Sequence, residues 1–597
     1  MTSVKQEVEQ QVRAAAISVL GATGDTDPLV RPAKGSKFGD YQANLAMPVA
    51  KRLGKNPREI GDQIAKRLML DNSANAAPVF TKIELAGPGF INLTLSDAYL
   101  SQRMAALISD SRLGVAVPAD RETVVVDYSS PNLAKEMHIG HLRSSIIGDS
   151  ICRVLAFLGH SVVRQNHLGD WGTQFGMLLE HLIDSGWDKD AAHSIGDLNQ
   201  LYQTAKQRFD AEPEFKQRAR QRVVALQAGD EQALILWRQL IAESVRHMNK
   251  VYQKLGLLLQ DEDIRPESFY NERLVAVVQD LQASSIIEEN DGAQVAFPPG
   301  FKNKEGEPLP LIVQKRDGGF GYAATDLAAG RFRVGELGAS RCVYVTDARQ
   351  SDHFAMFFSV LRSAGWAPQE EVRLEHVTFG SILGKDKKPF KTREGGTVRL
   401  ELVLDEAIDR ARSVVLKKRR GTAGSDAEDD DAADPELDKI ASAVGVGAVK
   451  YADLSSERIK DYVFDLDRML AMDGNTAPYL QNAYVRVQGI FRKLDSADDG
   501  WRSAPILLAK PTERALGLLL LQLPQVAEGV ADSLEPHRLC NYLYDLASGF
   551  HSFYEQCKVL KADTVQERNS RLALSELVAR ALRLGLGLLG IDTLEVM

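Results

Sequence analysis

Hydrophobic residues in the first part of the chain follow a helical spacing and then a β-like one. Helical patterns continue as far as Leu70. The runs Val79–Leu85 and Phe90–Leu95 then flank the turn Gly87-Pro88-Gly89. Two short runs around such a turn are typical of a β-hairpin. Residues 1–108 are therefore predicted to form a small α+β module.

From Arg121 the pattern becomes that of a parallel sheet. Thr123–Tyr128 is a run of the buried-strand type, a helical pattern extends from His138 to Leu158, and Ser161–Gln165 is the next strand. A strand, a helix and a strand in succession predict a βαβ unit, whose two strands lie parallel.

A second alternation predicts the rest of this sheet, beginning with a hairpin around Asp317-Gly318. The expected elements are the hairpin strands Leu309–Lys315 and Phe320–Ala323, helices from Thr325 to Leu337 and from Asp352 to Ala364, and strands Arg341–Val345 and Arg373–Phe379. The residues between the two alternations, about 175–290, are mostly helical and polar. This pattern predicts one Rossmann-like, doubly wound domain over 109–400 with a helical insertion.

Only helical patterns follow residue 400. Leu534–Phe553 and Arg571–Leu589 have the period of packed bundle helices, which predicts a helical connecting region over 401–474 and an all-α bundle over 475–597. The apolar runs Leu516–Leu521 and Leu584–Ile591 are far shorter than the ~18 residues of a membrane helix. No membrane partner is therefore expected.

Composition adds a compartment and a charge distribution. The 597 residues are roughly enough for three or four domains. The four cysteines form no C-x-x-C pair, which argues against a disulfide framework or a structural zinc site and indicates a reduced cytoplasm. The formal charge is −9, and Asp426–Asp438 contains eight acids and no base. This run falls in an acidic loop expected over 421–438, because Gly421–Pro435 lacks apolar periodicity and is predicted to be solvated.

One stretch carries the opposite charge. Arg31–Lys82 holds ten bases against four acids, with Phe38 and Tyr41 among them. Bases neutralise phosphates, and exposed aromatic rings stack on unpaired nucleobases, so an RNA surface is one interpretation. A polar helix face followed by a turn fits the same composition equally well.

The first βαβ unit lacks a G-x-G-x-x-G motif and carries two histidines at the start of its helix. His138 and His141 are three residues apart, which places both imidazoles on one side, and Gly140 between them leaves room for a ligand. The helix N-terminus adds free N–H groups and a positive dipole end. These features predict a phosphate site at the carboxyl end of the first strand. A capping pair and a metal site are the other interpretations.

The sequence from His138 to His141, His-Ile-Gly-His, is the signature tetrapeptide of the class I aminoacyl-tRNA synthetases, and its surroundings resemble the bacterial arginyl-tRNA synthetases. Further blocks resemble that family in the same order, at 166–176, 380–386, 448–453 and 474–479. The resemblance implies a ligase that activates L-arginine with ATP, releases pyrophosphate and transfers arginine to the 3′-terminal ribose of tRNA(Arg). It also implies Mg²⁺ with the nucleotide, and a cytoplasmic monomer.

The resemblance assigns an ATP site and a lysine. The residues that match the family's ATP site are His138, Gly140, His141 and, beside the adenine, His376 and Phe379. The second class I motif, Lys-Met-Ser-Lys-Ser, does not occur, and the corresponding place reads Lys-Lys-Pro-Phe-Lys-Thr-Arg over 387–393. By resemblance either Lys135 or Lys391 stabilises the pyrophosphate.

An arginine substrate favours a carboxylate fork beside a hydroxyl or amide, because its planar guanidinium has five donors. Tyr322 and Asp326 lie four apart across the start of a predicted helix and can face one pocket. By resemblance they bind the guanidinium and its stem; alternatively, Asp326 is a first-turn acid that favours the helix dipole. The positions that match the family's contacts to the amino and carboxylate ends of the substrate are Asp127, Asn132 and Gln350.

The two ends of the chain carry the expected tRNA contacts. The C-terminal helices resemble the anticodon-binding bundle of several class I synthetases, in which Tyr484 and Tyr554 are candidates to stack on bases. A core position is the alternative for each tyrosine. The N-terminal segment resembles a module that contacts the tRNA elbow, and its candidate residues are Phe38, Tyr41 and Gln42.

Three other functions fit part of the sequence. A small-molecule nucleotidyltransferase shares the H-x-G-H motif, but such enzymes are usually short and lack both end modules. A catalytically silent RNA-binding paralogue would not need intact His138, His141, Lys135 and Asp326. A cysteinyl synthetase shares the helical tail but needs a thiolate zinc site, for which the cysteines are missing.

Overall fold

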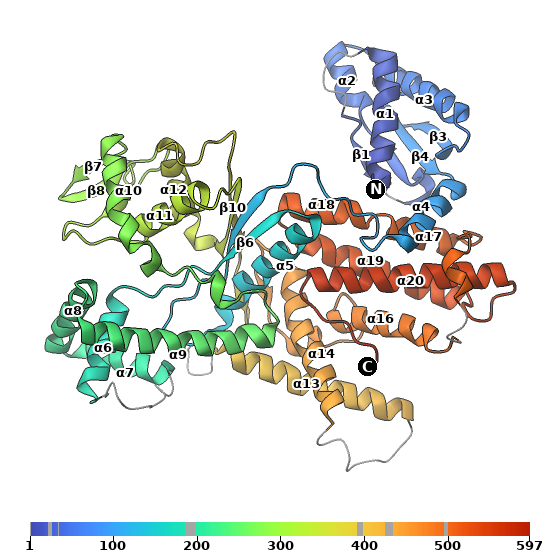
Figure 1. Ribbon diagram of the computed structural model, residues 1–597. Helices are drawn as coiled ribbons and strands as arrows, with labels where there is room; N and C mark the ends of the chain where they lie inside the picture. Colours follow the sequence, from blue (N-terminus) through green and yellow to red (C-terminus); the bar gives the residue numbers. More distant parts are fainter. Residues whose placement is uncertain are drawn as a thin grey trace.

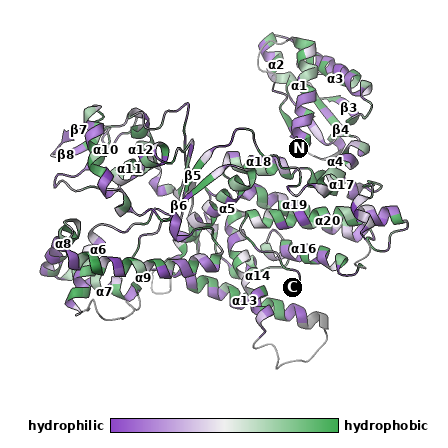
Figure 2. Cartoon of the chain, viewed as in Figure 1, coloured by the Kyte–Doolittle hydropathy of each residue, from purple (hydrophilic) through white to green (hydrophobic). Residues whose placement is uncertain are grey.

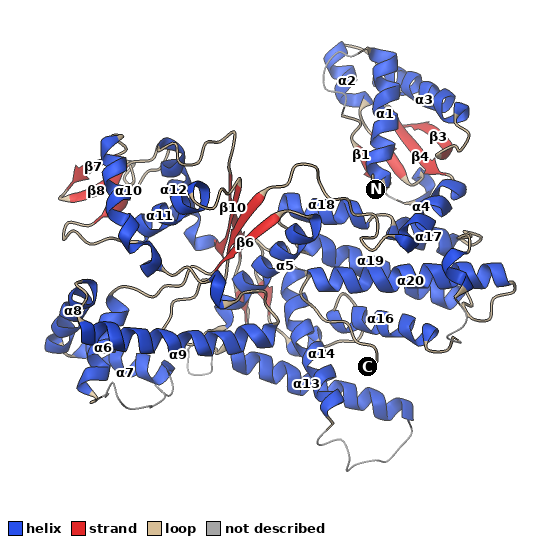
Figure 3. Ribbon diagram, viewed as in Figure 1, coloured by secondary structure: helices blue, strands red, loops and turns tan. Residues whose placement is uncertain are grey.

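The structure is a computed structural model, and it describes residues 2–21, 27–33, 35–186, 198–390, 398–423, 434–494 and 499–597. The chain forms, in order, an N-terminal α+β module, a central sheet interrupted by a large insertion, and a C-terminal set of helices (Figure 1). Figure 3 shows that helices dominate the C-terminal part. In the described ranges, no helix is long and apolar enough to cross a membrane.

The N-terminal module packs helices on an antiparallel sheet. Its elements are α1 Val4–Leu20, β1 Val30–Pro32, β2 Tyr41–Ala43, α2 Ala46–Leu53, α3 Pro57–Ala74, β3 Phe80–Ala86, β4 Phe90–Leu95 and α4 Asp97–Ser109. The strand order is β1-β2-β4-β3. The β3–β4 pairing confirms the predicted hairpin.

The central sheet is parallel throughout, as the alternation predicted. Its elements are β5 Thr123–Asp127, α5 Leu142–Leu158, β6 Ser161–Gln165, α11 Tyr322–Gly335, β10 Arg341–Asp347, α12 Ser351–Ser363 and β11 Arg373–Phe379. The strand order is β11-β10-β5-β6. Val124, Val125 and Val126 of β5 are at most 1% exposed, because helices cover both faces of such a sheet.

The insertion is helical at first and then contains a small sheet, of which only β9 lies within a predicted strand, Leu309–Lys315. Its elements are α6 Thr173–Asp184, α7 Leu198–Ala211, α8 Pro213–Gln227, α9 Glu231–Leu255, α10 Asn271–Ala283, β7 Ile287–Asn290, β8 Ala293–Ala296 and β9 Leu311–Gln314. The three strands are antiparallel. Figure 2 shows hydrophobic and hydrophilic residues alternating along α9.

The prediction of a two-stranded hairpin around Asp317-Gly318 is wrong, because only a single bridge forms across this turn. β9 pairs with β8, and only Gln314 and Phe320 form an isolated bridge across the turn. The residues expected as the second strand begin α11 instead, at Tyr322. Ala323 and Ala324 are buried helix formers, and this helical preference overrides the short strand-like pattern.

The C-terminal part consists mainly of helices. Its elements are β12 Ile382–Leu383, α13 Leu400–Ala423, α14 Pro435–Leu454, β13 Tyr462–Val463, α15 Leu466–Met469, α16 Ala477–Phe491, α17 Pro511–Leu520, α18 Leu523–Ser533, α19 His537–Gln556 and α20 Val565–Leu588. The loop predicted over Gly421–Pro435 is narrower than expected. α13 runs to Ala423, and α14 begins at Pro435 because Asp434 caps it by accepting from the backbone N–H of Glu436. Residues 424–433 lie outside the described ranges.

The N-terminal module contacts the C-terminal helices through charged groups. Both terminal nitrogens of Arg514 donate to the Asp40 carboxylate, each at 2.8 Å. Such a bidentate pair fixes orientation as well as distance. Arg580 of α20 donates to the carbonyls of Leu107 and Ile108 at the end of α4. These contacts set the module against α17 and α20.

Close packing of α5 on the sheet leads to a stability prediction. A Cβ added at Gly148 would lie 2.3 Å from the Cβ and Cγ of Tyr128, so Gly148→Ala forces helix and sheet apart. We expect a loss of about 1–3 kcal/mol, measured as a lower midpoint of thermal unfolding. Gly529→Ala in α18 is the matched control, because no atom lies within 4 Å of its added Cβ. Equal midpoints for the two variants would contradict the close contact.

Candidate active site

The histidine motif lies in a single 3₁₀ turn, Ile139–His141, that leads into α5. The backbone N–H of Gly140 donates to Nδ1 of His138, and that of His138 donates to Nδ1 of His141, both at 3.1 Å. The rings stack with centroids 3.9 Å apart. Because each Nδ1 accepts a hydrogen bond, each neutral imidazole carries its proton on Nε2.

The electrostatics keep both imidazoles neutral. Burial lowers the pKa of His141 to about 3, assisted by His138 and Lys135. Burial and the charge of Lys135 also lower the pKa of His138. The motif therefore offers Nε2–H donors, while Lys135 supplies the positive charge. The ammonium of Lys135 lies 4.1 Å from the ring centroid of Tyr202 in α7, which is a cation–π contact with the insertion.

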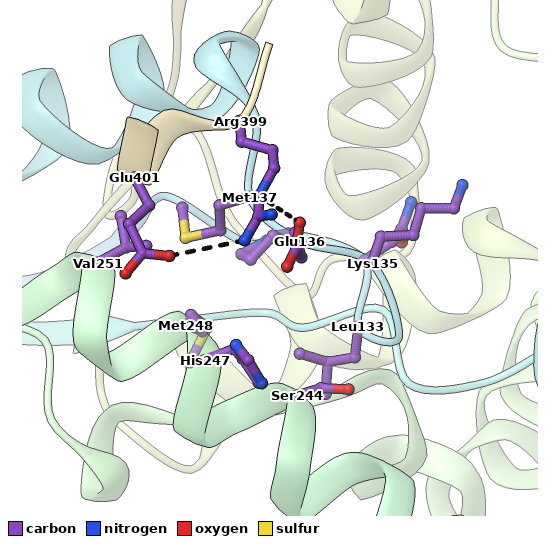
Figure 4. A pocket seen from close by; sticks show the side chains of 12 residues that line it. Leu133, Lys135, Glu136, Met137, Ser244, His247, Met248, Val251, Arg399 and Glu401 are labelled. Atoms are coloured by element: carbon purple, nitrogen blue, oxygen red, sulfur yellow. Dashed lines mark ion pairs between the residues drawn. The ribbon is translucent and has the colours of Figure 1, made fainter. Parts of the chain in front are cut away.

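Residues 398–400, which follow the lysine-rich stretch 387–393 in the sequence, pair with the histidine motif. Ile139 N–H donates to the carbonyl of Val398, and Leu400 N–H donates to that of Met137, both at 2.9 Å. Figure 4 shows a pocket beside this pairing, in which Arg399 is directed at Glu136 and forms a 2.6 Å ion pair with it; Lys135 is among the residues that line this pocket. Lys391 lies outside the described residues, so its predicted role stays a prediction.

Acidic groups lie near the start of α11, where Tyr322 and Asp326 are found; that these two residues face one pocket stays a prediction. Tyr322 is 70% exposed, and its pKa is raised by partial desolvation and by the charges of Glu267 and Asp326. Asp326 accepts from His353 of α12, with 2.6 Å between Oδ2 and Nε2. The hydrogen bond with Asp326 raises the pKa of His353.

Glu267 belongs to the same acidic group, since its charge acts on Tyr322 and the charge of Asp326 acts on it, and it was missed in the sequence. Burial raises the pKa of Glu267 to about 8, and the charges of Asp170 and Asp326 add to the shift. Its backbone N–H donates to the carbonyl of Leu168, which places it beside the segment after β6. Nothing local in the sequence marks Glu267, because it lies in the insertion, far along the chain from Asp326.

Three residues are expected to bind the amino and carboxylate groups of the substrate: Asp127, Asn132 and Gln350. They lie at or just after the C-terminal ends of β5 and β10. Asn132 is exposed and bridges to Gly169, where an added Cβ would lie 1.9 Å from the Asn132 amide oxygen. Gln350 is exposed at the end of a 3₁₀ turn after β10. Asp127 is buried, and its carboxylate accepts from Ser130 and Arg333 at 2.8 and 2.7 Å. A ligand at Asp127 has to share it with Arg333.

The adenine-side candidates lie together on β11. Nε2 of His376 is 2.7 Å from the Thr346 hydroxyl, and its ring stacks on Phe354 with centroids 4.4 Å apart. Burial, Arg458 and His353 lower the pKa of His376 to about 4. Phe379 is only 5% exposed. The neutral ring of His376 is therefore held in place before any ligand arrives.

Two of the expected tRNA contacts are wrong as base-stacking positions. Tyr41 is 4% exposed and Tyr484 is fully buried, so neither ring has a face for a nucleobase; hydrophobic burial outweighs the surface role. Phe38 is half-buried next to Lys37, whose ammonium is 4.8 Å from its ring centroid. Gln42 is half-buried and donates to Asn92, and Tyr554 is 39% exposed. These three stay predictions.

No group of three or more His, Cys, Asp or Glu side chains within the described ranges is arranged to hold a metal ion. The cysteines Cys152, Cys342, Cys540 and Cys557 are buried and free of disulfides.

Comparison with known proteins covers the whole chain. Family models match residues 3–95 as an arginyl tRNA synthetase N-terminal domain, 102–466 as a class I (R) tRNA synthetase catalytic domain, and 480–597 as a DALR anticodon binding domain. Proteins named arginine–tRNA ligase from Cellvibrio japonicus and Laribacter hongkongensis are 49% and 48% identical over 597 and 585 residues. The matches cover 100% and 98% of this chain and the same shares of those proteins.

Solved structures agree. The arginyl-tRNA synthetase of Plasmodium falciparum superposes with a TM-score of 0.84 at 30% identity over the full length of both chains. That of Thermus thermophilus, with a TM-score of 0.81 at 24% identity and the same coverage, has the same fold. The resemblance carried by the histidine motif is thereby confirmed, and the chain belongs to the arginyl-tRNA synthetase family of class I aminoacyl-tRNA synthetases.

Proposed function

We propose that the chain joins arginine to tRNA(Arg) in two steps at this edge of the sheet. The arginine carboxylate attacks the α-phosphorus of ATP and pyrophosphate leaves; the adenylate then esterifies the 3′-terminal ribose of the tRNA. The observation that carries the proposal is the pairing of two neutral Nε2–H donors, on His138 and His141, with an acidic pocket on the same parallel sheet. The donors suit phosphate oxygens, and the pocket suits a cation.

The phosphate side stabilises the charge that develops during transfer. Phosphoryl transfer relies on positioned donors and cations, since the transition state spreads charge over oxygen atoms. His138 and His141 donate to the phosphates, Gly140 leaves them access, and Lys135 stabilises pyrophosphate. Lys391 is the alternative for that last role. Mg²⁺ enters with ATP, whose phosphate oxygens are its preferred ligands.

The amino-acid side selects arginine by charge and shape. Asp326 and Glu267 bind the planar guanidinium, and Tyr322 flanks its stem. An uncharged amino acid would leave these carboxylates without a cation partner, so discrimination against it is strong. Asn132, Gln350 and Asp127 hold the amino and carboxylate ends, and His376 with Phe379 borders the adenine.

The tRNA lies along both ends of the chain. Phe38 and Gln42 contact the elbow, and Tyr554 contacts the anticodon. We further propose that the protein is a monomer and that it is cytoplasmic. The free thiols support the cytoplasmic location, because a reducing compartment preserves them.

Arginine-dependent exchange of pyrophosphate into ATP tests the activity. We expect exchange in the presence of tRNA(Arg), and a fall of about 10²–10³-fold for His138→Ala, which removes one donor. By resemblance, exchange also requires the tRNA. If no exchange occurs even with cognate tRNA, the chain is not a ligase; exchange that is independent of tRNA overturns only the coupling.

Asp326→Asn tests the guanidinium pocket. We expect the arginine KM to rise about a hundredfold, because a charged partner is replaced by a neutral one, with the ATP KM little changed. Glu336→Gln is the control, since Glu336 follows α11 and pairs with Arg273 at the surface at 3.2 Å. An unaltered arginine KM in Asp326→Asn would remove this carboxylate from the pocket.

The pKa of Glu267, about 8, predicts a pH dependence. Below about pH 8 this carboxyl holds a proton in the empty pocket and has to lose it before it can pair with a guanidinium. The arginine KM is therefore expected to fall as pH rises toward 8, by up to about tenfold per unit from this group, and to level off above. Steady-state exchange rates between pH 6 and 9 measure it. Glu267→Gln should remove the part of the pH dependence of the arginine KM that Glu267 causes. If the KM of this variant changes with pH as steeply as that of the unmodified protein, Glu267 does not bind the guanidinium.

A further inference from the structure

His353 contacts the proposed guanidinium carboxylate from the side. Its Nε2 is 2.6 Å from Oδ2 of Asp326, and the two side chains are 31% and 23% exposed. A carboxylate oxygen has two lone-pair sites, so this hydrogen bond leaves the other oxygen, Oδ1, and one lone pair of Oδ2 for a ligand. The imidazole therefore fixes the orientation of the carboxylate without blocking it.

Asp326 is the one charged group paired with this imidazole among the described residues. The elements packed most closely against α12 are α11, β11, the 3₁₀ turn Ala348–Gln350 and β9. α11 presents Asp326, and β11 presents His376, which stays neutral with its pKa near 4. The turn before α12 carries Asp347 and Arg349, which pair with each other at 2.8 Å. β9, Leu311–Gln314, has no titratable side chain.

We propose that His353 is a positioning residue that holds Asp326 for the guanidinium, and that arginine binding displaces a proton from its imidazolium to solvent. The proposal rests on the proposed function of Asp326 as the guanidinium ligand. It deepens that function, because it makes the occupancy of the arginine pocket depend on proton activity.

The displacement follows from charge. In the empty pocket an imidazolium beside Asp326 is stabilised by the carboxylate. A bound guanidinium takes over that carboxylate and adds a like charge nearby, so the pKa of His353 falls on binding. The N–H bond at Nδ1 breaks, its electrons stay on nitrogen, and the proton passes to buffer, while Nε2 keeps the proton that it donates to Asp326. The remaining neutral imidazole keeps one N–H, which still donates to Asp326.

Linkage fixes the direction of the effect. Because the empty pocket binds the proton more tightly than the filled one, arginine binds more tightly above the pKa of His353 in the empty pocket than below it. Glu267 releases a proton in the same direction, so a pH profile of binding alone does not separate the two. A substitution that removes only the titration of His353 does.

His353→Gln provides that substitution. The glutamine amide nitrogen takes the place of Nε2 and donates to Asp326, but it does not titrate near neutral pH. Calorimetric titration of the full-length protein with arginine, in buffers of different ionisation enthalpy at about pH 7, gives the number of protons released. We expect His353→Gln to release about 0.3–0.6 fewer protons per arginine than the unmodified protein. His160→Gln is the control, since His160 lies beside Glu122 at the opposite end of β6.

Steady-state kinetics test whether His353 positions Asp326, separately from any effect of the substitution on folding. His353→Ala should raise the arginine KM about five- to tenfold, because the Asp326 hydrogen bond is lost, with kcat unchanged, and His353→Gln should restore it. Equal proton release by His353→Gln and the unmodified protein overturns the proton coupling, and an unaltered KM in His353→Ala overturns the positioning role. If arginine gives no binding heat with the unmodified protein, the proposed pocket itself is wrong.

Discussion

The position of α5 is the constraint on which the rest of the site depends. Its N-terminus carries the histidine turn, and Gly148 brings its backbone against the Tyr128 side chain on the sheet. Arg143 and Asp453 form a 3.1 Å ion pair with both side chains at most 1% exposed, which ties α5 to α14. Breaking such a pair leaves an uncompensated buried charge. The imidazoles therefore cannot shift without disturbing the sheet or the connecting helices.

A buried ammonium joins the C-terminal turn to the same region. Lys450 of α14 is fully buried, and its Nζ donates to the carbonyls of Leu255 and Gly590 at 2.8 and 2.5 Å. Burial lowers the pKa of Lys450 to about 8, which shows how much solvation it has lost. A Cβ added at Gly590 would lie 2.7 Å from that nitrogen. The ends of α9 and α20 and the middle of α14 thus meet at one point beside α5.

What the sequence predicts depends on how local each feature is. The strands of the central sheet, the β3–β4 hairpin and α5 follow from periodicity and turn residues within a few positions. β7 and β8 were missed because these short strands alternate weakly, and β9 was predicted as a strand but with the wrong partner, since the turn signal at Asp317-Gly318 favoured another pairing. Tyr41 and Tyr484 were misjudged as RNA contacts because the direction of an aromatic side chain follows from packing, which spacing alone does not give.

The two halves of the site differ in the same way. The phosphate side is encoded locally, since His138, His141 and Lys135 lie within one loop and turn, and a short motif is enough to find it. The proposed guanidinium side is assembled in space from Glu267, Asp326 and His353, which belong to three separate elements. Burial and the charges of Asp170 and Asp326 raise the pKa of Glu267, so this group of acids favours a cation. Only the fold brings the group together, and in the proposed pocket it would favour a positively charged amino acid.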